Sequence, residues 1–110
     1  MIRRVIIESP YAGDVERNLR YLRACMRDSL LRGEAPFASH ALYTQPGVLD
    51  DGDPAEREHG IRAGFEWRAA AELTVFYGDL GWSRGMRAGL AHAQEIGCPL
   101  EYRLLGDWEP

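Results

Sequence analysis

The apolar residues of this chain alternate between two spacings, and this alternation limits the folds open to it. Short apolar runs, rich in β-branched or aromatic residues where they are strongest, predict buried strands. These runs lie at 2–7, 36–39, 73–77 and 100–104. Between them, apolar residues recur every three or four positions, which is typical of amphipathic helices. These segments span 15–31, 54–71 and 84–96. The predicted order is therefore β-α-β-α-β-α-β.

Residues that favour helix ends flank the three helical segments. Each segment is preceded by a good N-cap residue, namely Asp14, Asp53 and Ser83. Gly33 and Gly97 follow the first and third helices, where a glycine commonly ends a helix. The stretch 40–52 has no clear period and is predicted to be a loop. These signals support the helix boundaries independently of the apolar pattern.

Strands that alternate with helices favour a parallel sheet with right-handed crossovers. A strand order of 2-1-3-4 would open a crevice beyond the carboxyl ends of the first and third strands, where ligands bind in such sheets. The loops at 9–14 and 78–85 would face each other across it. We expect one domain over 1–105 and a short tail over 106–110.

The composition and charge of the chain limit the kinds of molecule that it is expected to bind. The 110 residues carry a net charge of −4, with thirteen arginines and no lysine. No basic run is present, which argues against binding to duplex nucleic acid. The arginine bias fits either a GC-rich coding genome or recognition of anions by the guanidinium group. Both interpretations remain open.

The sequence gives little indication of a membrane span, an export signal or a metal site. No apolar run approaches the roughly 20 residues of a membrane span, and the apolar start is too short for a signal peptide. We therefore expect a cytoplasmic protein without a membrane partner. Cys25 and Cys98 are predicted to be buried free thiols and make a weak case for zinc. We expect no metal and no cofactor.

The segment Ser83-Arg84-Gly85-Met86 opens the third helix directly after a strand and a loop. Free backbone N–H groups and the helix dipole make such a helix start an anion site. Gly85 would let an anion approach the backbone, and the Ser83 hydroxyl could contact it. The alternative is a plain N-cap without a ligand.

Other polar residues are expected at the same edge of the sheet. Tyr11 and Gly13 lie in the loop after the first strand, where Tyr11 could stack on a ligand or be a surface aromatic. His40 follows the second strand and could bind phosphate or move a proton. Asp79 ends the third strand and is placed for a ligand hydroxyl. Ser9, Asn18 and Met86 complete the candidates for ligand binding.

No catalytic triad, Cys-His pair, paired-His metal site or paired-carboxylate site is evident. Asp50, Asp51 and Asp53 form an acidic loop whose spacing matches no calcium loop. Glu66 lies late in the second helix and could point into the crevice or away from it. Asp51 and Glu66 are thus the weak candidates for a catalytic carboxylate. His59 and His92 are predicted to face solvent.

Four segments in this order resemble the nucleoside 2-deoxyribosyltransferase-like superfamily, most closely a group of short, mostly uncharacterised bacterial and phage domains related to it. The segments are 9–14 with Asn18, 35–40, 49–61 and 83–86. The resemblance implies a flavodoxin-like (Rossmann-like) three-layer α/β fold and a homodimer. It also implies a site for a nucleoside or nucleotide, with the Ser-x-Gly helix start taking phosphate or ribose.

The catalytic members of that superfamily are similar in placing a glutamate six positions after this serine. The glutamate attacks the anomeric carbon of deoxyribose while the base leaves, since a carboxylate can hold the sugar as an ester. Here the sixth position after Ser83 is Gly89. Three interpretations stay open: a nucleotide-binding domain without this chemistry, an N-glycosidase or deoxyribosyltransferase acting on deoxynucleoside monophosphates through another carboxylate, and a structural or protein-interaction module.

Overall fold

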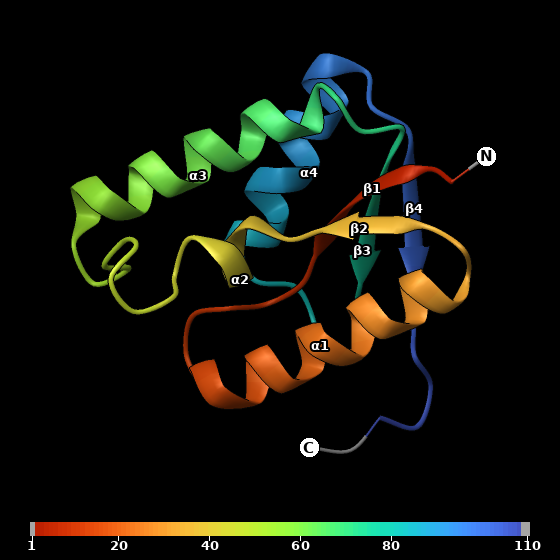
Figure 1. Cartoon of the computed structure of the whole chain (residues 1–110), viewed down its shortest axis with the longest axis horizontal. Helices are drawn as coiled ribbons and strands as arrows, with labels where there is room; N and C mark the ends of the chain where they lie inside the picture. The colour runs from red at the N-terminus through yellow and green to blue at the C-terminus, as the bar shows by residue number, and fades with distance from the viewer. Residues whose placement is uncertain (1, 109–110) are drawn as a thin grey trace.

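The computed structural model describes residues 2–108. Strands and helices alternate along the chain, with one additional short helix after the second strand (Figure 1). The elements are β1 (Arg4–Glu8), α1 (Val15–Leu31), β2 (Ala35–Phe37), α2 (Ser39–Leu42), α3 (Pro54–Arg68), β3 (Leu73–Tyr77), α4 (Arg84–Ile96) and β4 (Leu100–Arg103). No helix within this part of the chain is long and apolar enough to cross a membrane.

The four strands form one parallel sheet in the order β2-β1-β3-β4. This confirms the predicted α/β class and the order 2-1-3-4 of a flavodoxin-like fold. The two central strands pair with Ile7 opposite Val75. In Figure 1, α1 covers one face of the sheet, and α3 and α4 cover the other. The result is the three-layer arrangement that parallel sheets require, because both of their faces must be buried.

Alternation along the strands divides the core into two sides. Val5, Ile7, Leu73, Val75 and Tyr77 pack with Tyr21, Leu22 and Cys25 of α1. The intervening positions of β1 and β3 face α3 and α4: the hydroxyl of Thr74 and the carboxylate of Glu8 both contact Arg68 at the end of α3. The α3 and α4 side of the sheet therefore carries a buried polar group around Arg68.

The predicted N-caps are confirmed. The Asp14 side chain accepts a hydrogen bond from the Arg17 N–H at 3.2 Å. Asp53 accepts one from the Ala55 N–H at 2.9 Å, and Ser83 Oγ one from the Met86 N–H at 3.1 Å. Helix α4 ends at Gly97, whose φ of 72° is a left-handed conformation that favours glycine.

The stretch 36–52 differs from the prediction in two ways. Strand β2 ends at Phe37, because Ala38 turns out of the sheet and becomes the N-cap of α2. The single turn of α2 stands where a loop was expected, and periodicity cannot reveal so short a helix. Close packing holds it in place: a Cβ atom on Gly64 of α3 would lie 2.8 Å from the Cβ atom of Ser39. The glycine at position 64 thus lets α2 pack closely against α3.

Helix α3 is shorter than expected and buries an arginine. It ends at Arg68 rather than at 71, because a turn closed by the Ala70 N–H and the Trp67 carbonyl follows it. The buried residues of this helix are Gly64 and Arg68, whereas Ala69, which follows the helix, is exposed. An arginine therefore occupies a core position at the end of α3.

A second buried arginine lies on the α1 side of the sheet. Arg103 of β4 donates to both carboxylate oxygens of Glu34, at 2.7 and 2.8 Å, and to the Tyr77 hydroxyl at 3.1 Å. Ser29 of α1 donates to the same carboxylate at 2.8 Å. These bonds lower the pKa of Glu34 to about 2, with Arg103 as the main cause. The group ties β4 to α1 and to the residue before β2, and so acts as a structural bridge.

Candidate functional site

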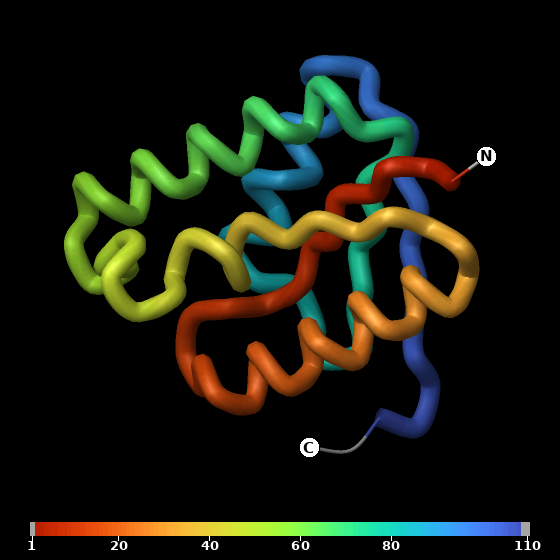
Figure 2. Tube along the Cα trace, in the orientation of Figure 1, coloured from red at the N-terminus to blue at the C-terminus, as the bar shows by residue number. Residues whose placement is uncertain are grey.

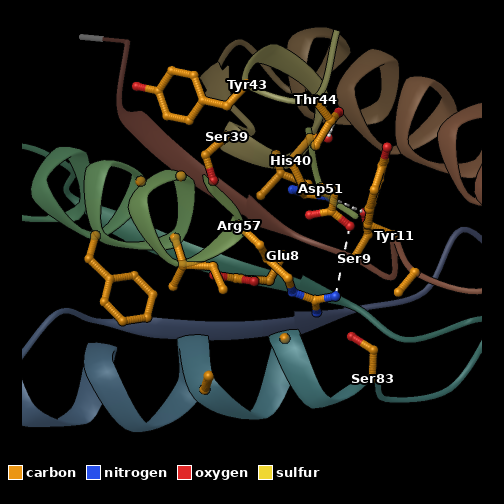
Figure 3. A pocket seen from close by; sticks show the side chains of 18 of the residues that line it. Glu8, Ser9, Tyr11, Ser39, His40, Tyr43, Thr44, Asp51, Arg57 and Ser83 are labelled. Carbon is orange, nitrogen blue, oxygen red and sulfur yellow. Dashed lines mark hydrogen bonds and ion pairs between the residues drawn. The ribbon is translucent and has the colours of Figure 1, made fainter. Parts of the chain in front are cut away.

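The carboxyl edge of the sheet opens into a cavity of about 460 Å³ on the side covered by α3 and α4 (Figure 3). Sites for small molecules are commonly of this size. Its walls come from the loop after β1, from α2 and the residues after it, from one face of α3 and from the first turns of α4. Figure 2 shows the first of these loops, in red, running beside the yellow chain that follows β2.

The cavity combines apolar surface with a small number of polar groups. Ile6, Phe37, Ile61 and Phe65 contribute apolar surface to its walls. The polar groups come from separate elements and lie around the same space (Figure 3). They are Glu8, Ser9, Tyr11, Ser39, His40, Tyr43, Thr44, Asp51, Arg57 and Ser83. Such a combination is typical of a pocket that orients a partly apolar ligand through a few directed contacts.

Glu8 ends β1 and reaches the cavity, with 14% of its side chain exposed. Its Oε2 atom accepts a hydrogen bond from Nη2 of Arg68, a side chain that is only 2% exposed. Burial raises the pKa of Glu8 to about 7, and the nearby Arg68 guanidinium opposes this rise only in part. The carboxyl group is therefore close to half ionised at neutral pH.

Arg68 is held by contacts on three sides. Its Nε donates to Thr74 Oγ1 at 3.1 Å, and its Nη1 donates to His92 Nδ1 at 2.9 Å. The guanidinium group also lies over the Phe65 ring, 5.3 Å from its centroid. Arg68 is thus a fixed support for Glu8. His92 was predicted to face solvent, which is wrong, because its ring stacks on Phe65 at 4.0 Å between centroids.

Gly89 of α4 packs against the Glu8 carboxylate. A Cβ atom at position 89 would lie 2.9 Å from Oε1 of Glu8 and closer still to Oε2. Any larger residue would force the carboxylate to move. Gly89 is the position at which the superfamily resemblance placed a glutamate. In this chain the carboxylate that lies against this position comes from β1.

Ser9 and His40 form a hydrogen-bonded pair beside Glu8. Ser9 Oγ lies 2.8 Å from His40 Nε2 (Figure 3). Burial lowers the pKa of His40 to about 4, so its ring is neutral at physiological pH. A neutral imidazole and a hydroxyl can each donate or accept one hydrogen bond to a ligand. This pair is therefore suited to orienting a ligand rather than to attracting a charge.

The start of α4 forms the opposite wall. Ser83 Oγ accepts a hydrogen bond from the Met86 N–H, so this serine caps α4. In residues 2–108, the N–H groups of Arg84 and Gly85 donate to no protein atom, and Gly85 lines the cavity. A Cβ atom on Gly85 would meet nothing closer than Ser83 Oγ at 3.8 Å. The helix start thus presents free donors and open space to the pocket.

Of the acidic loop, Asp51 lines the pocket. Its Oδ2 lies 3.8 Å from Arg57 Nη1 (Figure 3). Asp50 accepts from the Gly52 N–H at 2.9 Å, and Asp53 caps α3, so both have local structural roles. Within the described residues, no group of three or more His, Cys, Asp or Glu side chains could hold a metal ion.

The structure brings most of the predicted site residues to one cavity. Those that line it are Ser9, Tyr11, Gly13, His40, Asp51, Ser83 and Gly85. Asn18 is buried behind the loop and donates to the carbonyls of Tyr11 and Ala12, at 2.9 and 3.1 Å. It therefore shapes the loop instead of lining the pocket.

Three predicted residues lie elsewhere. Asp79 is on the α1 side, where its carboxylate accepts from the N–H groups of Leu105 and Gly106, at 2.9 and 3.1 Å. The Met86 side chain is fully buried. Glu66 is exposed on α3, and neither it nor the other two side chains lines the cavity.

Sequence reasoning missed Glu8, Arg68 and Arg57 as pocket residues. Glu8 carried a usable signal, because it is a single acid at the last position of an apolar strand. Parallel strands direct that position toward the ligand edge. Arg68 gave no comparable signal, since it is held by side chains of β1, β3 and α4 that lie far from it in the sequence.

A family model described as "Domain of unknown function (DUF7768)" matches residues 3–103. The chain belongs to this family. No curated protein matches its sequence. Among solved structures, a 2-deoxyribosyltransferase from the psychrotolerant bacterium Bacillus psychrosaccharolyticus shares the fold of this DUF7768 domain. The TM-score is 0.72 at 17% identity, over 97% of this chain and 76% of the other. That enzyme is described as a biocatalyst for the synthesis of antiviral and antitumoral nucleosides.

Proposed function

We propose that the cavity binds a nucleoside or nucleotide, and that this domain stands near the short bacterial and phage members of the nucleoside 2-deoxyribosyltransferase-like superfamily. The proposal rests on one observation: a single cavity of about 460 Å³ has both apolar walls and the free N–H groups at the start of α4. A nucleotide has the matching parts, an apolar base face and an anionic or hydroxyl-bearing sugar phosphate. The fold shared with a 2-deoxyribosyltransferase supports the same ligand class.

The two walls of the pocket would bind different parts of the ligand. Ser83, Gly85 and the exposed Arg84 would receive the phosphate or the ribose hydroxyls at the start of α4. Tyr11 would contact the base from the opposite loop. Ser9 and His40 would bind a polar edge of the ligand through their spare hydrogen-bonding capacity. We also propose that the domain forms a homodimer, which sedimentation analysis would test.

N-glycosidic cleavage of a deoxynucleoside monophosphate is the second candidate function. It is favoured by the presence of carboxylates in the same cavity, Glu8 toward the sheet and Asp51 beside Arg57. Glu66 does not support it, because that side chain is exposed outside the cavity. A purely structural module is less well supported, because the crevice is open instead of filled by side chains.

Ligand-induced stabilisation of the folded domain tests the binding proposal. A ligand present at 100 times its dissociation constant adds about 2.7 kcal/mol to the free energy of unfolding. We expect this gain from at least one member of a panel of 2′-deoxyribonucleosides and their 5′-monophosphates, measured as a rise in Tm. No rise from any member would refute the proposal.

A matched pair of variants tests the place of binding. Gly85→Glu and Gly85→Gln add side chains of similar size into open space, but Gly85→Glu also puts a negative charge where the phosphate is expected. We expect Gly85→Glu to weaken binding of the 5′-monophosphate far more than Gly85→Gln. Equal losses would place the phosphate elsewhere. An acid in the first turn of a helix is tolerated, so folding should be kept.

A further inference from the structure

We propose that Glu8 is the nucleophile of this pocket, and that its Oε1 atom attacks the anomeric carbon of a bound 2′-deoxyribonucleoside or 2′-deoxyribonucleotide. The proposal rests on the proposed function, since it requires that such a ligand binds. It assigns the attacking carboxylate to a residue on β1, whereas the superfamily resemblance places that carboxylate on α4. Three features of this carboxylate support the assignment: its position, its free oxygen and the residues that hold it.

Glu8 lies at the centre of the ligand-binding edge. It is the last residue of β1, one of the two central strands, and its side chain enters the cavity between α3 and α4 (Figure 3). The phosphate-binding start of α4 is on the other wall of the same cavity. A ligand anchored by its phosphate or hydroxyls at Gly85 would extend its sugar toward the carboxylate.

The two oxygens of Glu8 have different surroundings. Oε2 accepts from Arg68, whereas Oε1 makes no hydrogen bond with any residue from 2 to 108. Every fully buried side-chain nitrogen or oxygen in that range has a hydrogen-bond partner. Oε1 therefore cannot be fully buried, and it is left to face the cavity that Glu8 lines. One oxygen is fixed by the protein and the other is available to a ligand.

The support of the carboxylate restricts its orientation. Arg68 is fixed by Thr74, His92 and Phe65, and Gly89 leaves room for the carboxylate on the side of α4. A nucleophile held in one orientation avoids the entropic cost of ordering during the reaction. Asp51 and Glu66 lack this arrangement, because Asp51 is paired with the partly exposed Arg57 and Glu66 lies outside the cavity.

The chemistry follows from an oxocarbenium-like transition state, which a nearby carboxylate stabilises. The bond between Oε1 and C1′ forms while the C1′–N bond breaks, and its electron pair leaves with the base, which takes a proton from water. A water molecule then attacks C1′, the ester bond breaks, its electron pair returns to Glu8, and the water loses a proton. The net reaction consumes one water and yields free base and 2-deoxyribose or its phosphate.

The ionisation of Glu8 predicts how the rate changes with pH. Only the carboxylate form attacks, and burial raises the pKa of this group to about 7. Release of base should therefore rise with pH and level off above about 7. A carboxylate kept from full hydration is also a stronger nucleophile than one in water, because less solvent must be removed before it attacks.

The experiment combines base release with a search for the ester. Wild-type protein, Glu8→Gln, Glu8→Asp and the control Glu72→Gln are incubated with 2′-deoxyribonucleosides and their 5′-monophosphates, and free base is separated by chromatography. Glu72 forms an ion pair with Arg4 outside the cavity, so the control removes the same charge without touching the pocket. Intact-mass spectra of quenched samples report a sugar adduct, which peptide mapping assigns to a residue.

We expect base release by wild-type and Glu72→Gln proteins, a fall of more than about 1,000-fold in Glu8→Gln, and an adduct on the peptide containing Glu8. Binding, followed by the rise in Tm, should persist in Glu8→Gln. Binding without base release at stoichiometric wild-type protein would overturn the proposal and leave the binding function intact. Base release that survives in Glu8→Gln, or an adduct on another residue, would also overturn it. Absence of binding would instead refute the proposed function itself.

Discussion

Replacing Glu8 with glutamine should stabilise this domain at neutral and alkaline pH. Glutamine resembles the protonated form of the side chain and keeps a carbonyl oxygen for the Arg68 hydrogen bond. The pKa of Glu8 rises from 4.5 to about 7 on folding because burial disfavours the ionised form. At about 1.4 kcal/mol for each pH unit, the ionised side chain costs the folded state about 3 kcal/mol.

The sign of this effect depends on pH. Below pH 4.5 the group is protonated in the folded and unfolded chains alike, so its charge has no effect on stability. As the pH rises toward 7, the unfolded chain ionises freely while the folded chain resists, and stability falls. Glu8→Gln should therefore match the wild-type free energy of unfolding near pH 4. It should exceed that of the wild type by about 3 kcal/mol at pH 8.

The measurement is urea unfolding of both proteins at pH 4, 6 and 8, analysed as the difference between them. The difference is needed because His40 acts in the opposite direction: its pKa falls from 6.5 to about 4 on folding, so stability is lost as the pH drops through that window. Glu72→Gln is the matched control, and as a change at the surface it should alter stability by less than about 0.5 kcal/mol. A Glu8→Gln variant less stable than wild type at pH 8 would refute the reasoning, since the ion pair with Arg68 would then outweigh the burial.

Predictions for four further variants follow from the structure. Arg103→Met should lower the free energy of unfolding by about 3 kcal/mol at pH 7, because the buried Glu34 carboxylate then keeps only the half-exposed Arg3 as a charged partner. Urea unfolding measures this loss, and a change below about 1 kcal/mol would contradict it. Gly89→Ala should slow base release about 100-fold, because the added methyl group displaces the carboxylate beside it; unchanged release, measured by chromatography, would contradict this. Gly85→Ala adds a methyl group in open space and should raise the free energy of unfolding by up to about 1 kcal/mol, which urea unfolding measures. Asp79→Asn should destabilise the domain by about 1–3 kcal/mol, because the Asp79 carboxylate accepts hydrogen bonds from the N–H groups of Leu105 and Gly106. The Kd of the ligand, measured by calorimetry, should stay unchanged; weaker binding would mean that Asp79 contacts the ligand.

The fold was accessible from the sequence because its signals are local. The strands at 4–8 and 73–77 are short β-branched or aromatic runs, and Asp14, Asp53 and Ser83 cap helices through their own neighbours. Alternation of strands and helices then leaves few topologies for a parallel sheet. These features need no knowledge of how distant segments pack.

The site could be predicted from the sequence only in part, because the position of several of its residues depends on packing between distant segments. Arg68 is held in the core by Glu8, 60 positions earlier, which provides a counter-charge, and by His92 of α4. Asp79 follows a strand in the expected way, but its carboxylate serves the N–H groups of the chain after β4. Spacing along the sequence does not show which side of the sheet such a residue serves.

The central claim is that a nucleoside or nucleotide occupies the cavity at the carboxyl edge of the sheet. The most direct measurement is a titration of isotopically labelled domain with the 2′-deoxyribonucleoside 5′-monophosphates, followed by amide chemical shifts. The account predicts saturable shifts concentrated at Ser9, Gly13, His40 and Gly85, with little change at Glu34 and Arg103 on the other face. Shifts centred away from the cavity, or no shifts at all from a folded protein, would contradict it.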